Sequence, residues 1–160
     1  MNYRVIANLF FLLFLGVADN QAIAALLPPL VKSFGITVAS AGLMVTVYSL
    51  AAALAAFVSG SLSDHFGRRR FLVVGALVFA VASWLSSRCQ TFGEILLARS
   101  LTGLAAGTIS TCSIAYAGDW FAYAVRGRAV SLISTAYFMA PSRRFVWGRL
   151  ARPWFSEVRR

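Results

Sequence analysis

Charged residues are scarce in this 160-residue chain, and their scarcity argues against a soluble globular protein. Only 12% of the residues are charged and 59% are hydrophobic, and the mean hydropathy is +0.75. Soluble domains usually carry about 25% charged residues. A soluble helical protein would also need polar faces that recur at the helical period, and the apolar stretches of this chain lack them. The composition therefore predicts an integral membrane protein.

Histidine and cysteine are also rare, which argues against two further classes of protein. His65 is the only histidine, and it lies beside arginines rather than in a cluster of metal-ligating residues, so we expect no metal site and no cofactor. Of the two cysteines, Cys89 falls in an expected loop and Cys112 in an expected helix, which makes a disulfide framework improbable. Kinase and nucleotide-binding motifs do not occur either, and no enzymatic chemistry is indicated.

Long apolar runs predict an all-α membrane protein with four transmembrane helices and an incomplete fifth. A spanning helix needs about 20 mainly apolar residues. Four segments approach this length, namely Ile6–Leu30, Ala39–Leu62, Phe71–Ser87 and Phe92–Tyr116. A fifth run begins at Ala129 and ends near Ala140, which is too short to cross a bilayer. We also expect Pro28 and Pro29 to end or bend the first helix.

The net charge of +10 is distributed in a way that predicts a topology rather than nucleic-acid binding. Arg4, Arg68–Arg70 and the pair Arg126 and Arg128 fall in alternate loops, whereas the intervening loops hold only Lys32 and Arg88. The positive-inside rule then places the N-terminus in the cytoplasm of a multi-pass protein of the plasma (inner) membrane, with the lipid bilayer as its partner. The apolar run after Arg4 also fits a cleaved signal peptide, but the spans that follow favour a retained helix.

The polar segment Gly60–Leu72, with the sequence GSLSDHFGRRRFL, forms a tight hairpin between two membrane-length helices. Its pattern Gly-x-Leu-x-Asp-x-x-Gly-Arg-Arg-Arg resembles the loop between the second and third helices of major facilitator superfamily transporters. The resemblance covers about residues 6 to 140. It implies that residues 1–140 form part of the N-terminal helix bundle of such a transporter.

The charges of this hairpin have unfavourable places with respect to the helix dipoles, so they need other partners. Asp64 lies at the end of one helix and Arg68 near the start of the next, and the two can pair across the turn because Gly67 supplies a permissive backbone. Arg68 can also reach Asp119 at the end of the fourth helix. The resemblance implies a network that steadies the outward-open state, comprising Gly60, Asp64, Gly67, Arg68 and Asp119. The alternative, a solvated run of charges that sets topology, is preferred for Arg69 and Arg70.

Two ionisable residues lie within the expected spans, where each costs about 2.5–3.5 kcal/mol on insertion scales. Asp19 is near the middle of the first helix, and the run Gly16–Pro29 resembles the first helix of the superfamily. Arg99 opens the pattern Arg-x-x-x-Gly-x-x-x-Gly of the family's fourth helix, although Thr102 stands where a glutamine is often found. The resemblance implies that Asp19 and Arg99 lie on the substrate or proton pathway. The alternatives are that Asp19 only bonds a neighbouring helix and that Arg99 extends to the outer surface.

Small residues recur at spacing four on two helices and predict close helix packing. They are Ala52, Ala56 and Gly60 on the second helix, and Gly103 and Gly107 on the fourth. Such stripes let the backbones of two membrane helices approach each other.

The final segment, residues 141–160, holds six of the fifteen basic residues and departs from the family pattern. A shifted reading frame or a disrupted gene would produce such an arginine-rich end. A basic juxtamembrane segment that binds anionic lipid is the alternative.

The sequence thus favours a fragment of a proton-coupled secondary transporter, of the drug–proton antiporter or efflux type. Its partners in the full-length parent are a small-molecule substrate, protons and the missing C-terminal half, and nucleic acid is not among them. A small exporter that self-assembles from four helices is one alternative. A membrane protein that assembles with or regulates another transporter, without transporting anything itself, is the other.

Overall fold

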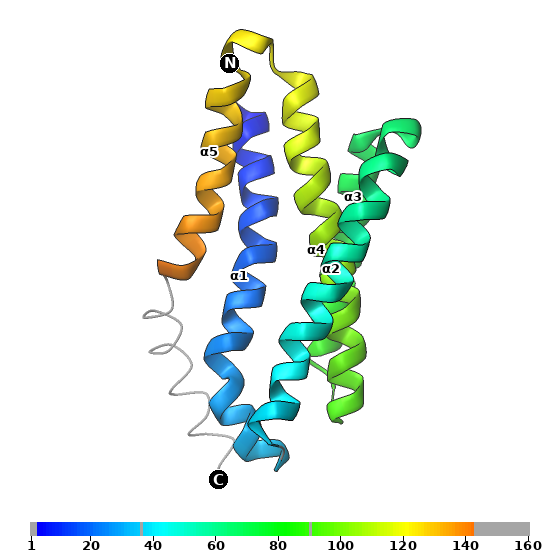
Figure 1. Ribbon diagram of the computed structural model, residues 1–160, viewed down its shortest axis with the longest axis vertical. Helices are drawn as coiled ribbons and strands as arrows, with labels where there is room; N and C mark the ends of the chain where they lie inside the picture. The colour runs from blue at the N-terminus through cyan, green and yellow to red at the C-terminus, as the bar shows by residue number, and fades with distance from the viewer. Residues whose placement is uncertain (1–2, 36, 90, 143–160) are drawn as a thin grey trace.

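The computed structural model describes residues 3–142, apart from positions 36 and 90, and this part of the chain contains five α-helices and no strand (Figure 1). The helices are α1 (Tyr3–Phe34), α2 (Val38–Phe66), α3 (Arg68–Ser86), α4 (Phe92–Trp120) and α5 (Tyr123–Ser142). Within the described residues, segments of α1 to α4 are long and apolar enough to cross a membrane, and α5 does not meet that criterion. The predicted fold class, four spanning helices followed by an incomplete fifth, is confirmed.

Two helix boundaries differ from those expected. The helix α1 continues through Pro28 and Pro29 to Phe34, so the prolines do not end it. Prolines are tolerated in membrane helices because neighbouring groups can satisfy the freed backbone carbonyls. The helix α5 begins at Tyr123 rather than at Ala129, because Arg126 and Arg128 interrupt the apolar run without interrupting the helix. The expectations for the tail concern residues that, apart from Pro141 and Ser142 of α5, lie outside the described part of the chain.

Local sequence signals cap the two helices that start at the end of the bundle opposite the N-terminus. Thr37 caps α2 by accepting a hydrogen bond from the Ser40 amide at 3.2 Å. Thr91 and Glu94 form a capping box at the start of α4, in which each side chain accepts a hydrogen bond from the other residue's amide at 3.3 Å. These caps satisfy amides that would otherwise be left without partners at a helix start.

The helix α4 is the centre of the packing, since both α2 and α3 lie against it, while α1 packs mainly against α5 (Figure 1). The contact between α2 and α4 is made by backbone. A Cβ atom added at Gly103 or Gly107 would overlap the carbonyl oxygen of Tyr48 or Ala52, respectively. The small residues Gly103 and Gly107 of α4 thus let the backbone of α2 approach closely.

Three segments meet at one end of the bundle: the start of α1, the turn between α2 and α3, and the connection between α4 and α5 (Figure 1). Side chains from all three share one buried apolar cluster, which includes Ile6, Leu72 and Phe121. We call this end the basic end, because it carries Arg4, Arg68, Arg69, Arg70, Arg126 and Arg128. The sequence expectation places it in the cytoplasm.

Candidate functional site: two ion-pair networks and a cavity between the helices

At the basic end, Arg68 joins three helix ends through two carboxylates. Its Nη2 atom lies 2.8 Å from Oδ1 of Asp64, and its Nε atom lies 3.0 Å from Oδ2 of Asp119. Asp64 is in the last turn of α2, Arg68 begins α3 and Asp119 is in the last turn of α4. The positive φ of 94° at Gly67 permits the turn that places the first two residues together.

The two ion pairs of Arg68 are solvent-accessible, and this limits their strength. The Asp64 and Asp119 side chains are 55% and 65% exposed, while that of Arg68 is 23% exposed. Exposed pairs contribute about 0–1 kcal/mol each. The network can therefore bias a conformational equilibrium and still break reversibly. Gly60 does not touch these charges; it lies one turn earlier on α2 and faces the Thr111 side chain of α4.

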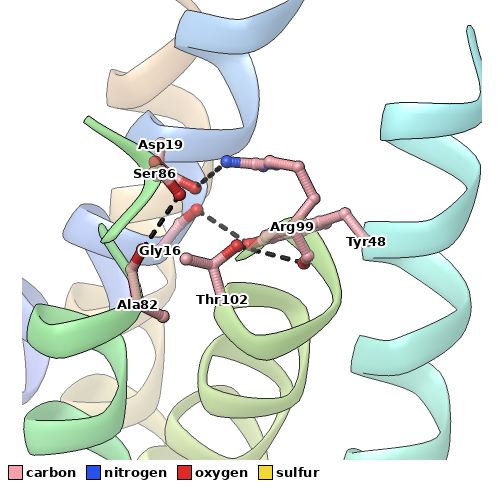
Figure 2. A network of polar contacts seen from close by, with 7 residues as sticks. All are labelled: Gly16, Asp19, Tyr48, Ala82, Ser86, Arg99 and Thr102. Atoms are coloured by element: carbon pink, nitrogen blue, oxygen red, sulfur yellow. Dashed lines mark hydrogen bonds and ion pairs between the residues drawn. The ribbon is translucent and has the colours of Figure 1, made fainter. Parts of the chain in front are cut away.

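Inside the bundle, Arg99 of α4 pairs with Asp19 of α1 (Figure 2). The Nη1 atom of Arg99 donates to Oδ2 of Asp19 at 2.7 Å. The Arg99 side chain is only 2% exposed, whereas that of Asp19 is 27% exposed. The pairing joins residues that are 80 positions apart in the sequence. The alternative that Arg99 extends to the outer surface is wrong, because its side chain is buried inside the bundle.

Tyr48 of α2 completes this site. The Arg99 guanidinium lies over the Tyr48 ring at 4.6 Å from the ring centroid, a favourable cation–π arrangement. The Tyr48 hydroxyl donates to the carbonyl oxygen of Gly16 in α1 at 3.1 Å. Thr102 donates to the Arg99 carbonyl oxygen at 3.0 Å and so is satisfied within α4. Asp19, Tyr48 and Arg99 thus connect α1, α2 and α4 near one level of the bundle.

One edge of the Arg99 guanidinium has no hydrogen-bond partner in the described part of the chain. Only Nη1 is bonded, while Nε and Nη2 are both buried and unpaired. In a guanidinium these two atoms form the edge that binds a carboxylate through two parallel hydrogen bonds. Arg68 uses the same pair of atoms to hold its two carboxylates. Arg99 therefore keeps a binding edge that the chain's described residues leave unfilled.

A cavity of about 420 Å³ lies beside this ion pair, between α1, α2, α4 and α5. Its walls are mostly apolar, with polar groups from Asn20, Gln21, Tyr48, Ser110 and Tyr137. Ser110 and Tyr137 share a hydrogen bond of 2.6 Å between their hydroxyl groups. Asp19 and Arg99 are not in the wall, but Asn20 and Tyr48 connect them to it. The sequence analysis did not identify Tyr48 and Tyr137 as site residues. A polar hydroxyl group within an apolar run is the sequence feature that could have indicated them.

The sequence profile of the Major Facilitator Superfamily matches residues 9–142. The chain belongs to the major facilitator superfamily. It is therefore a multi-pass membrane protein of a transporter family, as the pattern of its second-to-third-helix loop indicated.

The chain is similar to several relatives whose names refer to different small molecules. A probable 4-methylmuconolactone transporter of Cupriavidus pinatubonensis is 29% identical over 87% of this chain and 32% of its own length. The 4-hydroxybenzoate transporter PcaK of Pseudomonas putida is 34% identical over 66% of this chain and 23% of its own. The quinolone resistance protein NorA of Staphylococcus aureus is 27% identical over 68% of this chain and 28% of its own. The chain spans about a third or less of the length of these relatives.

Proposed function

We propose that this chain supplies the first helices of a proton-coupled transporter of small organic molecules. The observation that carries the proposal is the Asp19–Arg99 ion pair, buried beside a cavity of about 420 Å³. Ionisable residues inside a membrane bundle usually mark substrate or ion pathways because they are costly elsewhere. The similarity to a quinolone resistance protein favours export as the alternative direction, and export would require that a proton displaces the substrate.

The ion pair suggests how a proton and a substrate could be coupled. When Asp19 is ionised, it neutralises Arg99 through the bond to Nη1. A proton on Asp19 removes this counter-charge, so Arg99 then gains from a second anion. A proton thus favours anion binding at Arg99, and the loss of that proton releases the anion, which is the reciprocity required of linked equilibria. A proton and an anion coupled in this way cross the membrane in the same direction.

A specific observation favours organic acids as the substrate class. The unpaired Nε and Nη2 atoms of Arg99 match the geometry of one carboxylate. The Tyr48 ring and the apolar cavity wall suit an apolar or aromatic body attached to it. Two relatives are named as transporters of 4-hydroxybenzoate and 4-methylmuconolactone.

The network of Arg68 would control the conformational cycle. It ties the ends of α2 and α4 to the start of α3 at the basic end, and we propose that it steadies the state that is closed on this side. Breaking it shifts the populations by no more than its differential energy between the two states.

The basic end lies in the cytoplasm and Cys89 outside in this proposal. An impermeant thiol reagent on intact cells should then label Cys89 and spare Cys112, and the reverse pattern would overturn the topology.

The transport proposal is tested with a full-length transporter that carries these residues. Purified protein in vesicles with an imposed proton gradient should move an aromatic acid, and Asp19→Asn should abolish the dependence on the gradient while insertion stays normal. Asp19→Glu is the matched control, since it keeps a protonatable carboxylate. Normal gradient dependence in the Asn variant would make Asp19 structural.

The rival functions give different results in the same assay. We expect the 160-residue chain alone to be inactive, because alternating access needs two bundles around a central site. Gradient-driven movement by this chain above the rate of empty vesicles would instead favour a small self-assembling exporter. Copurification with another transporter, without transport by the chain itself, would favour a regulatory protein.

A further inference from the structure

The basic end carries five arginines that the Arg68 network does not use. All are exposed, and none has an ion-pair partner among the described residues; they are Arg4, Arg69, Arg70, Arg126 and Arg128. The acidic residues described at this end, Asp64 and Asp119, are both bound to Arg68. Six arginines against two carboxylates leave this part of the surface with a net charge of +4.

These arginines all lie on helix starts at one end of the bundle. Ile6, Leu72 and Phe121 come from the three segments that carry them, and all three side chains are buried in the same apolar cluster. Arg4 is in the first turn of α1, Arg69 and Arg70 are in the first turn of α3, and Arg126 and Arg128 are in the first two turns of α5. The helix α1 packs against α5 and α3 packs against α4, so these helix starts all lie at the same end of the bundle.

Exposed aromatic side chains accompany the arginines at the same end. Tyr3, Phe66, Trp120 and Tyr123 are 67%, 60%, 52% and 89% exposed, respectively. The Trp120 ring stacks on Tyr116 at 5.6 Å between centroids, which restricts its direction. Aromatic rings with polar tips are enriched at the level of lipid headgroups. Their presence places the arginines at that level and favours a lipid surface over a soluble polyanion.

We propose that the basic end binds the phosphate groups of anionic phospholipids in the leaflet that it faces. Each arginine close to an anionic surface contributes about 1 kcal/mol, so five of them are enough to enrich anionic lipid locally. Guanidinium groups also hold phosphate through paired, charge-assisted hydrogen bonds. The proposal requires only that the helices span a membrane, and it is independent of proton coupling or substrate. The lipids would contact the starts of α1, α3 and α5 from outside the bundle.

Trp120 provides a direct readout of this contact. Replacing the other tryptophans (Trp84→Phe, Trp147→Phe and Trp154→Phe) leaves Trp120 as the only source of tryptophan fluorescence. The chain is then placed in phosphatidylcholine vesicles that contain the same minor fraction of either brominated phosphatidylglycerol or brominated phosphatidylcholine. Bromine quenches nearby indoles. One arginine near the surface already favours anionic lipid about fivefold, so brominated phosphatidylglycerol should collect near Trp120. It should quench the Trp120 fluorescence at least about twofold more strongly than brominated phosphatidylcholine.

The variant Arg126→Gln/Arg128→Gln should lose most of this preference, and the variant with lysine at both positions should keep part of it. Arg88→Gln is the matched control, because Arg88 lies over the Trp84 ring at the opposite end and its loss should leave the preference unchanged. High salt should weaken the preference because exposed charges are screened. Equal quenching by the two brominated lipids would overturn the proposal. Loss of the preference on adding inorganic phosphate, at constant ionic strength, would also overturn it, since the site would then be one for free phosphate.

Discussion

Adding one methyl group at Gly107 should destabilise the chain, because it acts on the closest contact of the bundle. In Gly107→Ala the new Cβ would overlap the carbonyl oxygen of Ala52 and lie 2.8 Å from both its carbonyl carbon and its Cα. These atoms are helix backbone, so α2 must move as a unit rather than rotate one side chain. Overpacking costs about 1–3 kcal/mol. Alanine recovers up to about 1 kcal/mol through its higher helix propensity, and we expect a net loss of up to about 2 kcal/mol.

A second glycine of α4 provides a control of opposite sign. A Cβ added at Gly118 meets no atom within 4 Å, so Gly118→Ala should stabilise the chain by about 0.5–1 kcal/mol through helix propensity alone. Both variants make the same chemical change in one helix, and their difference therefore isolates packing. The measurement is unfolding in mixed micelles with increasing dodecyl sulfate, followed by circular dichroism. If Gly107→Ala proves as stable as Gly118→Ala, the close approach of α2 and α4 is refuted.

Three further predictions concern the charged groups. Asp19→Asn should cost about 3–5 kcal/mol of stability because Arg99 is left as a buried, unpaired charge. Adding Arg99→Gln to this variant should recover part of that loss in the same unfolding assay. If the stability losses of the two single variants simply add in the double variant, the two residues are not coupled. Asp64→Asn in a full-length transporter should lower the transport rate by up to about fivefold, the effect of a pair worth about 0–1 kcal/mol, while insertion in the membrane stays constant. A wild-type transport rate would show that Asp64 serves only to set the membrane topology. Burial and the Glu94 carboxylate raise the pKa of the Cys89 thiol above its ordinary value of 9.0, so less thiolate is present at neutral pH and the rate of maleimide labelling should still be rising above pH 9. The variant Glu94→Gln, which can keep the capping box, should speed labelling at fixed pH. An unchanged labelling rate in this variant would exclude the charge effect.

Features that depend on neighbours in the sequence could be predicted from the sequence. The four spans follow from hydropathy alone, which needs no knowledge of packing. The pairing of Asp64 with Arg68 crosses a single turn, and Gly67 has the positive φ that such a turn requires. The family was indicated by the loop pattern for the same reason, since its residues are contiguous. The extension of α1 beyond Leu30 to Phe34 was not predicted, because local rules for proline take no account of support from neighbouring helices.

Only the tertiary structure decided which helices meet and what the buried charges contact. Asp19 and Arg99 could be singled out separately by their cost in a membrane, but their bond joins residues 80 positions apart and requires α1 to lie against α4. The place of Tyr48 beneath Arg99 follows from the close approach that Gly103 and Gly107 permit. The unfilled edge of Arg99 is likewise a property of the packed bundle. Whether a buried donor has a partner depends on all the groups that pack around it. Hydropathy acts along one helix, whereas these contacts depend on the relative rotation and spacing of several.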